Sequence, residues 1–254
     1  MNGKKKKLIH VWIEDPGLGD LIRGVVCLYQ LSKQKNYDFF VDVSYHPIRQ
    51  FLNYQGYHLV PLPDKNRIKF IKWFRGAPDI SLYIARHFET NDVLFLCANC
   101  SIDTFESPIS DDCRQFLLSI LNFRMELFDV PTTRYNILHI RLRDKHDQAD
   151  IKRVYKIFVK NVEPDDFLMS NSTEFKKYVS KQFHKFPIQM MDLEICHFGE
   201  CRNEAHLKNT LSEYILASRA RFIKTFSDYW WTSGFMNSIS VIYNIPLINL
   251  KSSL

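Results

Sequence analysis

The sequence contains no hydrophobic run long enough to cross a membrane, although 46% of its 254 residues are hydrophobic. A membrane-spanning helix needs about 20 consecutive apolar residues, whereas runs such as LIHVWI and DVLFLC are short and bounded by charged residues. The N-terminal stretch MNGKKKK also lacks the apolar core and small-residue cleavage site of a secretory signal. These absences predict a soluble protein of the cytoplasm with no transmembrane segment.

The sequence also lacks the patterns of nucleic-acid-binding and zinc-binding proteins. The formal net charge is only +6, and the lysines are dispersed rather than gathered with aromatic residues along one helix, which argues against nucleic acid as the main partner. This charge suits an anionic ligand, or simply a lysine-rich surface. CANC is one tight cysteine pair, but CHFGEC is spaced too widely to be the second pair of a zinc site. We therefore expect reduced thiols rather than a metal site at the six cysteines: Cys27, Cys97, Cys100, Cys113, Cys196 and Cys201.

No internal repeat or low-complexity segment is evident, and strand-like and helix-like segments alternate throughout. Residues 7–43 read as a strand, an amphipathic helix and a second strand, which form a β-α-β unit with parallel strands. The segment 128–135, FDVPTTRY, is the best boundary because the alternation restarts after it. The pattern predicts an α/β protein of two Rossmann-like, doubly wound lobes, residues 1–130 and 131–254, facing a cleft where strand carboxyl ends bind ligands.

The expected elements follow from the apolar periodicity and the turn residues. In the first lobe the sequence predicts strands at 8–14, 37–43, 57–62 and 92–97, and helices at 19–36, 46–55 and 110–123. In the second lobe it predicts strands at 136–142, 166–171, 188–193, 221–227 and 240–249, and helices at 150–162, 173–183, 207–219 and 229–238. Ser110 is the expected N-cap of the helix at 110–123.

The segment EDPGLGDLIRG, residues 14–24, lies where the first strand joins the first helix. Gly17 and Gly19 allow a sharp turn and expose backbone amides at a helix N-terminus, where anions bind. As a dinucleotide fingerprint the loop is imperfect, because the next glycine, Gly24, comes too late. Asp20 at the helix start would repel a phosphate. The loop therefore either turns tightly for geometric reasons alone or faces a sugar.

The stretch HIRLRD places three basic side chains near the end of one expected strand. If residues 137–144 are extended throughout, His139, Arg141 and Arg143 share one face, and Asp144 begins the loop. Two arginines on a buried face need an anionic partner, because an unpaired buried charge is costly. One interpretation is an edge strand whose arginines form salt bridges in water. The other is an anion site, in which the planar arginine fork binds phosphate oxygens.

Two further strand ends supply small polar side chains. RFIKTFSDYWW leads from a strand into a turn with Thr225 and Ser227. Their hydroxyls and the amides of the expected next helix would together form a phosphate cradle, although Ser227 could equally serve only as an N-cap. FLMSNST ends a strand at Ser170 and Asn171, where these side chains can meet a base or a ribose.

These motifs, in this order, resemble those of the α-1,2/α-1,6/protein O-fucosyltransferase superfamily, whose members have the GT-B fold. The superfamily's H-x-R-x-x-D/N motif is matched by His139, Arg141 and Asp144. LMSNS is similar to its second motif, with Asn171 in place of the usual Asp, and LSEYILASRARFIKTFSDYWW is similar to its third. GLGDLIRGVVCLYQLSKQ resembles its opening glycine loop and helix. The set covers most of the chain, but Leu142 replaces the second arginine of the usual first motif.

The resemblance implies that the first lobe faces the acceptor and that the second lobe binds a nucleotide-sugar donor. It implies metal-independent, inverting transfer of fucose from GDP-fucose to a glycan hydroxyl, without a cofactor. Arg141 would hold the β-phosphate and stabilise the departing diphosphate, which preorganised cations and amides can do without a metal. The sequence also has no Asp-x-Asp element, which normally holds the divalent ion of metal-dependent glycosyltransferases.

The resemblance also gives roles to the other residues of these motifs. His139 would support the nucleotide or the geometry of the motif, and Asn171 would contact guanine or ribose. Thr225 and Ser227 would bind the phosphates. The donor-binding set expected from the loops and motifs together is His139, Arg141, Asp144, Ser170, Asn171, Thr225, Ser227, Gly17 and Gly19.

Transfer to a hydroxyl group needs a general base, and the sequence does not single one out. Asp20 and Asp15 in the glycine loop are the candidates, so the expected catalytic residues are Arg141 and Asp20. Two alternatives stay open. The absence of a recognisable base and the asparagine at position 171 also fit a catalytically degenerate protein that binds nucleotide sugars. An unrelated α/β nucleotide-binding enzyme, such as a reductase, is the other, although the imperfect glycine loop argues against it.

Overall fold

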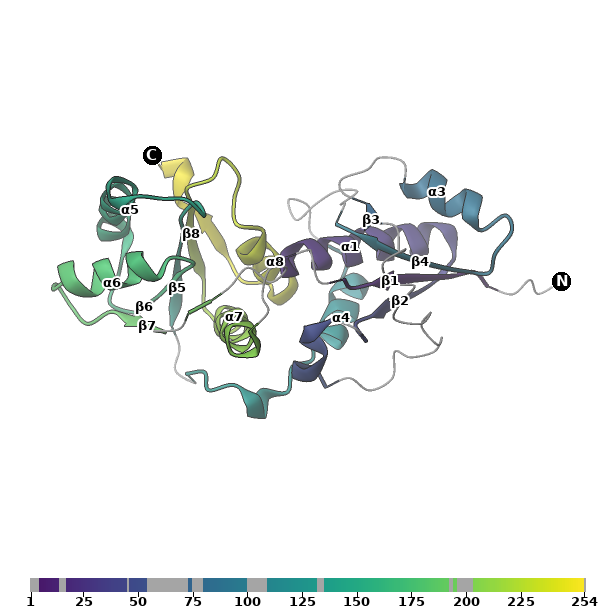
Figure 1. The fold of residues 1–254 in the computed structure, drawn as a ribbon, viewed down its shortest axis with the longest axis horizontal. Helices are drawn as coiled ribbons and strands as arrows, with labels where there is room; N and C mark the ends of the chain where they lie inside the picture. Colours follow the sequence, from purple (N-terminus) through teal and green to yellow (C-terminus); the bar gives the residue numbers. More distant parts are fainter. Residues whose placement is uncertain are drawn as a thin grey trace. The chain divides into compact units, whose positions relative to one another are not determined.

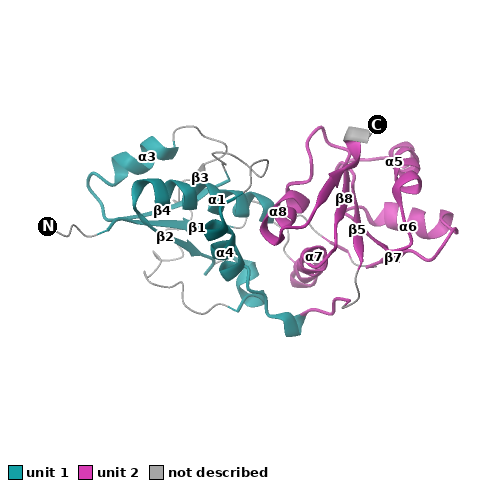
Figure 2. Ribbon diagram, turned by 180° about the vertical axis from the view of Figure 1, so that it is seen from behind, with its two compact units in different colours: residues 1–127, 198–200 teal, residues 128–197, 201–254 magenta. Residues whose placement is uncertain are grey.

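The computed structural model describes residues 5–13, 17–44, 46–53, 73–74, 80–99, 109–131, 135–191, 194–195 and 203–253. These residues form two compact units, each an α/β layer structure, as Figure 2 shows. The change from unit 1 to unit 2 falls between Leu127 and Phe128, whereas the sequence predicts it after residue 130. The expected strand at 57–62 lies outside the described residues. None of the described helices is long and apolar enough to span a membrane.

Unit 1 is built around a four-stranded parallel sheet (Figure 1). The order β2-β1-β4-β3 puts the first and last long strands side by side, and the sheet changes winding direction between them. Its elements are β1 (Lys7–Val11), α1 (Leu18–Lys35), β2 (Asp38–Asp42), η1 (Pro47–Phe51), β3 (Trp73–Phe74), α3 (Ile80–His87), β4 (Val93–Ala98), α4 (Asp111–Ile120) and η2 (Met125–Leu127).

Helix α1 packs directly on the sheet of unit 1 because its buried face is lined by small and aliphatic side chains. Cys27, Leu28 and Leu31 contact a core that also contains Leu8 of β1 and Leu96 of β4. Asn36 ends the helix in the left-handed conformation, with a φ of 57°, which asparagine tolerates better than most residues. The Ser110 hydroxyl caps α4 by accepting from the Cys113 N–H, as the sequence predicts.

Unit 2 contains a five-stranded parallel sheet of order β7-β6-β5-β8-β9 (Figure 1). The chain winds outward from β5 in one direction and from β8 in the other, so the topological switch point lies between β5 and β8. Ligands of doubly wound sheets bind at the carboxyl ends of the strands at such a point. The elements are β5 (Asn136–Arg141), α5 (Gln148–Asn161), β6 (Asp166–Ser170), α6 (Thr173–Gln182), β7 (Gln189–Met190), α7 (Glu204–Ala217), β8 (Ile223–Ser227), α8 (Gly234–Tyr243), β9 (Leu247–Asn249) and η3 (Leu250–Ser253).

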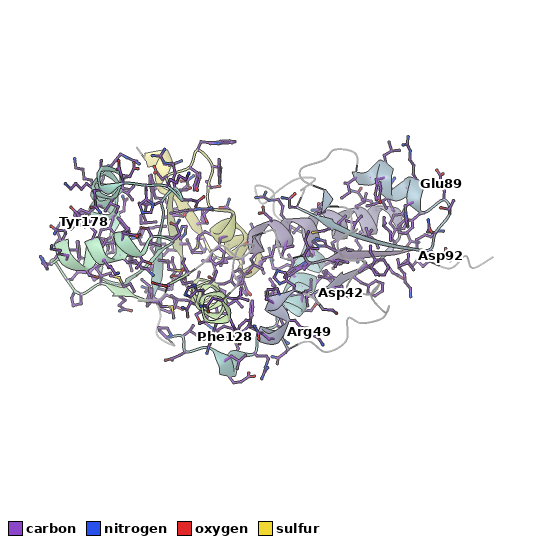
Figure 3. All side chains as sticks on the ribbon, in the orientation of Figure 1. Asp42, Arg49, Glu89, Asp92, Phe128 and Tyr178 are labelled. Carbon is purple, nitrogen blue, oxygen red and sulfur yellow. The ribbon has the colours of Figure 1, made fainter. Side chains whose placement is uncertain are left out.

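Alternate residues of the central strand β5 face opposite sides of the sheet, as the period of a strand requires. Leu138 and Ile140 belong to the core that α5 and α6 cover, while α8 packs on β8, β9 and α7. Side chains fill the space between the helices and the sheet within each unit (Figure 3). The predicted α/β class is therefore confirmed, whereas the cleft between the lobes stays a prediction.

Three predicted elements of unit 2 have different bounds in the structure. The strand expected at 136–142, with extended chain as far as Arg143, ends at Arg141, because the Leu142 backbone bonds to the Asn171 side chain instead of to a neighbouring strand. The helix expected from Tyr229 begins at Gly234, where Ser233 caps it. The strand expected at 240–249 is only Leu247–Asn249, because α8 continues to Tyr243 and Asn244, with a φ of 54°, ends it.

Candidate anion-binding site

The carboxyl ends of β5, β6 and β8 bring together most of the residues that the sequence singles out. In the parallel register His139 lies opposite Thr225, and Arg141 lies opposite Ser227. On the other side of β5, Ile140 lies opposite Ser170. These three strand ends flank the switch point of the sheet, so the side chains around Arg141 form the candidate site.

Arg141 is the cation of this site to which the described residues supply no counter-ion. Its partly buried guanidinium makes no hydrogen bond or ion pair with any residue that the structure describes. It lies over the ring of Tyr229, with its carbon Cζ 5.0 Å from the ring centre, in a cation–π contact. The five donors of the guanidinium are therefore available to an anion, and the planar group is already oriented by the ring beneath it.

Ser227 adds an unused hydroxyl beside Arg141. Its side chain is only 2% exposed, and its Oγ has no hydrogen-bond partner within the described parts of the chain. A buried hydroxyl without a partner costs about 1–3 kcal/mol, so it is a natural place for a ligand oxygen. Ser227 is not the N-cap of the following helix, because Ser233 has that role. The N-cap interpretation of Ser227 is therefore wrong.

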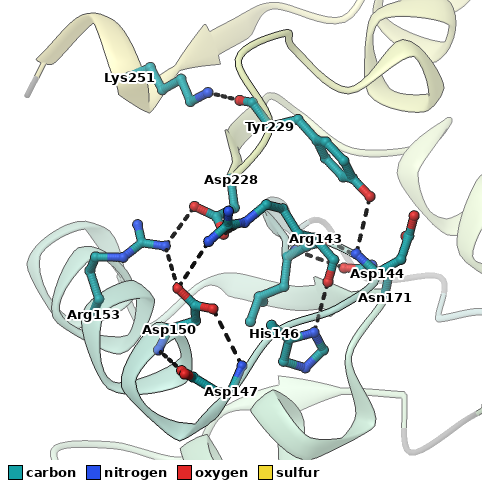
Figure 4. A network of polar contacts seen from close by, with 11 residues as sticks. Arg143, Asp144, His146, Asp147, Asp150, Arg153, Asn171, Asp228, Tyr229 and Lys251 are labelled. Atoms are coloured by element: carbon teal, nitrogen blue, oxygen red, sulfur yellow. Dashed lines mark hydrogen bonds and ion pairs between the residues drawn. The ribbon is translucent and has the colours of Figure 1, made fainter.

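Arg143, by contrast, is neutralised by carboxylates of the protein (Figure 4). Its Nε lies 3.0 Å from Asp228 and its Nη2 lies 3.2 Å from Asp150. Arg153 contacts the same two carboxylates, at 2.7 Å and 3.2 Å. Hydrogen bonding to Asp228 raises the pKa of Arg143. Because β5 ends at Arg141, the predicted shared face with Arg143 is wrong; Arg143 instead ties the loop after β5 to the end of β8.

Asn171 shapes the same loop from the end of β6. Its amide oxygen accepts from the Leu142 N–H at 2.9 Å, and its amide nitrogen donates to the Leu142 carbonyl at 3.0 Å. The Ser170 hydroxyl, also at this end, accepts from the Ser172 N–H. His146 joins the Ser172 hydroxyl and the Arg143 carbonyl through its two ring nitrogens. Asn171 thus positions the loop after β5, and the contact of Ser170 and Asn171 with a nucleotide stays a prediction.

The double contact of Asn171 explains why an asparagine can stand where the resembling family usually has an aspartate. Asn171→Asp would keep the acceptor for the Leu142 N–H but would place a carboxylate against the Leu142 carbonyl. We expect a loss of about 1–2 kcal/mol in the free energy of unfolding, measured by urea denaturation. Asn249→Asp is the matched control, because the Asn249 side chain accepts from the Lys251 N–H through its oxygen, and none of its described contacts uses the amide nitrogen. Equal stabilities of the two variants would contradict this explanation.

His139 is buried and neutral. Its Nδ1 shares a 2.9 Å hydrogen bond with the Thr225 hydroxyl. Burial, and to a smaller extent the charge of Arg141, lowers the pKa of His139 to about 3. His139 therefore brings no positive charge to the site near neutral pH, and Thr225 is its partner. The histidine supports the geometry of the strand pair rather than attracting a phosphate.

The lowered pKa of His139 makes the stability of unit 2 depend on pH. In the unfolded chain the imidazole gains its proton near 6.5, and in the folded chain only near 3. Stability is thus fully present above pH 6.5 and is lost as the pH falls towards 3, by up to about 1.4 kcal/mol per pH unit. We expect His139→Gln to flatten the pH dependence of the urea unfolding free energy between pH 7 and about 5. Parallel pH profiles of the two proteins would contradict this assignment.

Tyr229 is a residue of the site that sequence reasoning missed. Its hydroxyl accepts from the Asp144 N–H at 3.1 Å, and its carbonyl accepts a hydrogen bond from the Lys251 ammonium (Figure 4). Asp144 is exposed and lies in the loop, so its link to the site is this contact with Tyr229. The sequence signal was the aromatic run directly after Ser227, which resembled the first turn of a helix.

Part of the predicted glycine loop of unit 1 belongs to helix α1. Gly17 is the N-cap residue, and Gly19 and Asp20 belong to the first turn of the helix. The Asp20 carboxylate lies 3.6 Å from the Arg23 guanidinium, and both side chains are partly exposed. Asp15 lies outside the described residues. The roles of Gly17, Gly19 and Asp20 in binding and catalysis stay predictions.

No cluster of side chains able to hold a metal ion occurs within the described ranges. Among the described residues, Cys27, Cys97 and Cys113 are buried thiols that form no disulfide. Burial raises the pKa of Cys113 to about 11, so this thiol stays protonated. The remaining cysteines, Cys100, Cys196 and Cys201, lie outside the described residues.

Comparison with known proteins gives matches in structure only. No protein-family model matches the chain, and curated protein sequences give no significant match. Among solved structures, FUT1 from Arabidopsis thaliana in complex with GDP is similar, with a TM-score of 0.59 and 11% identity over 97% of this chain and 70% of that one. Fucosyltransferase NodZ from Bradyrhizobium has a TM-score of 0.54 and 14% identity, covering 98% and 97% of the two chains. Its selenomethionine form scores 0.52 at 13% identity, covering 94% and 93%.

At these identities the similarity shows a shared fold. The chain has the α/β fold of these GT-B fucosyltransferases, which confirms the fold expected from the motif resemblance.

Proposed function

We propose that the chain is a glycosyltransferase that binds a nucleotide sugar at the carboxyl edge of the unit 2 sheet. The observation that carries this proposal is the pair of Arg141 and Ser227 at the switch point: among the described residues the Arg141 guanidinium has no counter-ion and the Ser227 hydroxyl has no hydrogen-bond partner. A cation and a hydroxyl in this arrangement suit a diphosphate. The fold similarity to fucosyltransferases, one of them crystallised with GDP, supports the same assignment.

The arrangement suits the chemistry of glycosyl transfer. When the bond from the sugar to the diphosphate breaks, negative charge develops on the leaving phosphate oxygens. A fixed guanidinium stabilises that charge without reorganisation, since Arg141 is held against Tyr229 before any ligand binds. Asp228 and Asp150 do not compete for Arg141, because both carboxylates are paired with Arg143 and Arg153.

We further propose that the protein transfers fucose from GDP-fucose to a glycan hydroxyl without a metal ion and with inversion at the sugar carbon. Inversion requires the acceptor oxygen to attack the face opposite the diphosphate while a base removes its proton. Asp20 is the base we propose to test, by Asp20→Asn in a transfer assay.

A panel of ligands tests the proposal directly. We expect GDP and GDP-fucose to raise the melting temperature, and UDP, dTDP and NAD to have much smaller effects. Stabilisation by NAD alone would contradict the proposal. Slow release of GDP from GDP-fucose without acceptor would then indicate an enzyme, whereas GDP binding with no turnover under any acceptor would indicate a binding protein of this fold.

A further inference from the structure

The segment between β8 and α8 presents two tryptophans to solvent directly beside the candidate diphosphate site. Trp230 is 88% exposed and Trp231 is 43% exposed. Large aromatic side chains are rarely left in water without a purpose, because each can bury about 150–250 Å². Neither ring contributes to the described cores of the two units, so their exposure needs an explanation outside folding.

The two tryptophans are held in place rather than loose. Trp231 stacks on Tyr229, with ring centres 4.6 Å apart and an interplanar angle of 23°. Trp230 meets Trp231 edge to face, at 5.1 Å and 90°. Tyr229 is in turn fixed by contacts with Arg141, Asp144 and Lys251. The loop therefore forms a preorganised platform of Tyr229, Trp230 and Trp231, which loses little conformational entropy when it binds a ligand.

The size of this aromatic platform argues against a protein partner. A stable protein interface covers about 800 Å² on each side, and two tryptophans supply only a part of that. Ile248 is the one other large hydrophobic side chain of unit 2 that is strongly exposed among the described residues. A small ligand with one apolar face fits the platform better.

The exposure of Trp230 also favours a sugar over a nucleobase as the ligand of this ring. A base that is recognised specifically needs an enclosed site with hydrogen-bonding groups around its edge. No hydrogen bond or ion pair of the Trp230 side chain occurs in the described part of the chain, which leaves an open ring face. A pyranose can lay a face of axial C–H groups on such a ring and keep its hydroxyls in water, because those C–H groups are complementary to the negative π face.

We propose that the platform of Tyr229, Trp230 and Trp231 binds the acceptor saccharide, with Trp230 as the residue on which a pyranose ring stacks. This inference rests on the proposed function, since it gives the acceptor's class and its place beside the donor diphosphate. Tyr229 is a positioning residue that links the platform to Arg141, and Trp230 is the specificity-determining contact.

Saccharide binding to the full chain tests the inference. The probes are lactose, N-acetyllactosamine and cellotetraose, with the acyclic polyol sorbitol as the control that lacks a ring face. Binding is followed by saturation-transfer NMR and tryptophan fluorescence. We expect Trp230→Ala to weaken binding of at least one probe by about tenfold or more, and Trp230→Phe to recover most of it. Leu82→Ala, which removes another exposed apolar side chain in unit 1, should have no effect.

Calorimetric titration of the same variants with GDP separates this inference from the proposed function. We expect Trp230→Ala to keep the GDP affinity of the wild type within about twofold, while Arg141→Ala loses it. Equal saccharide binding by wild type and Trp230→Ala, or no probe binding better than sorbitol, would overturn the platform. So would a loss of GDP affinity in Trp230→Ala with unchanged saccharide binding, since the ring would then hold the base. Failure of the wild type to bind GDP would overturn the proposed function instead.

Discussion

Arg141→Ala is expected to weaken GDP binding by about 100-fold, which corresponds to ~2.7 kcal/mol. The guanidinium is the one charged group at the switch point that no described residue neutralises, and each hydrogen bond to a charged group contributes about 1.5–3 kcal/mol. The fold should be unaffected, because the side chain is only partly buried and its one described contact is the face of Tyr229. Isothermal titration calorimetry with GDP, together with urea unfolding of both proteins, measures the two effects separately.

Arg143→Ala is the matched control, since it removes the same group two residues along the chain. Its charge is already used by Asp228 and Asp150, so GDP affinity should change by less than about fivefold. Arg141→Lys keeps the charge but loses the planar fork, and we expect an intermediate loss. If Arg143→Ala weakened GDP binding as much as Arg141→Ala, the anion site would lie in the salt-bridge network rather than at Arg141.

Gly24→Ala is expected to have the largest effect on stability. A Cβ at this position would lie 1.7 Å from the Ala98 carbonyl oxygen and 2.7 Å from both the Ala98 carbonyl carbon and His10 Cε1. Two of these atoms are backbone, so α1 and β4 would have to move apart in the middle of the unit 1 core. Overpacking of this kind costs about 3 kcal/mol or more. Urea unfolding monitored by circular dichroism should show a clearly lower midpoint.

Gly19→Ala provides the comparison for this variant. Gly19 lies in the first turn of the same helix and is partly exposed, so alanine there should be neutral or stabilising by up to about 1 kcal/mol. Equal effects of the two substitutions would show that helix propensity, and not close packing at Gly24, determines the result. In the sequence, Gly24 is notable only because it stands too far along the chain to complete a dinucleotide fingerprint. In the structure, the close contact of Gly24 with Ala98 sets the distance between α1 and β4.

The alternation of strands and helices could be predicted from the sequence because each element carries its own apolar period. The β-α-β pattern also predicts parallel strands, whereas the order of the strands in each sheet is known only from the structure. The ends of elements were less accessible. β5 ends at Arg141 because the Leu142 N–H bonds to the side chain of Asn171, 29 positions away. Local strand propensity cannot predict a contact between residues so far apart in the sequence.

The candidate site could be predicted in part for the same reason. Arg141 and Ser227 stand at strand ends, and strand ends can be read from the pattern. The ion pair of Arg143 with Asp228 could not be predicted, because Asp228 is 85 positions away in the sequence. The aromatic run after Ser227 was misassigned to a helix, since Ser233 and not Ser227 is the N-cap. The exposure of its tryptophans could therefore be seen only in the structure.

The position of a bound diphosphate tests the central claim most directly. A crystal structure of the chain with GDP should place one phosphate within hydrogen-bonding distance of both the Arg141 guanidinium and the Ser227 hydroxyl, with Arg143 still paired to Asp228. A diphosphate bound elsewhere, or one bound at this edge of the sheet without contact to Arg141, would contradict the account.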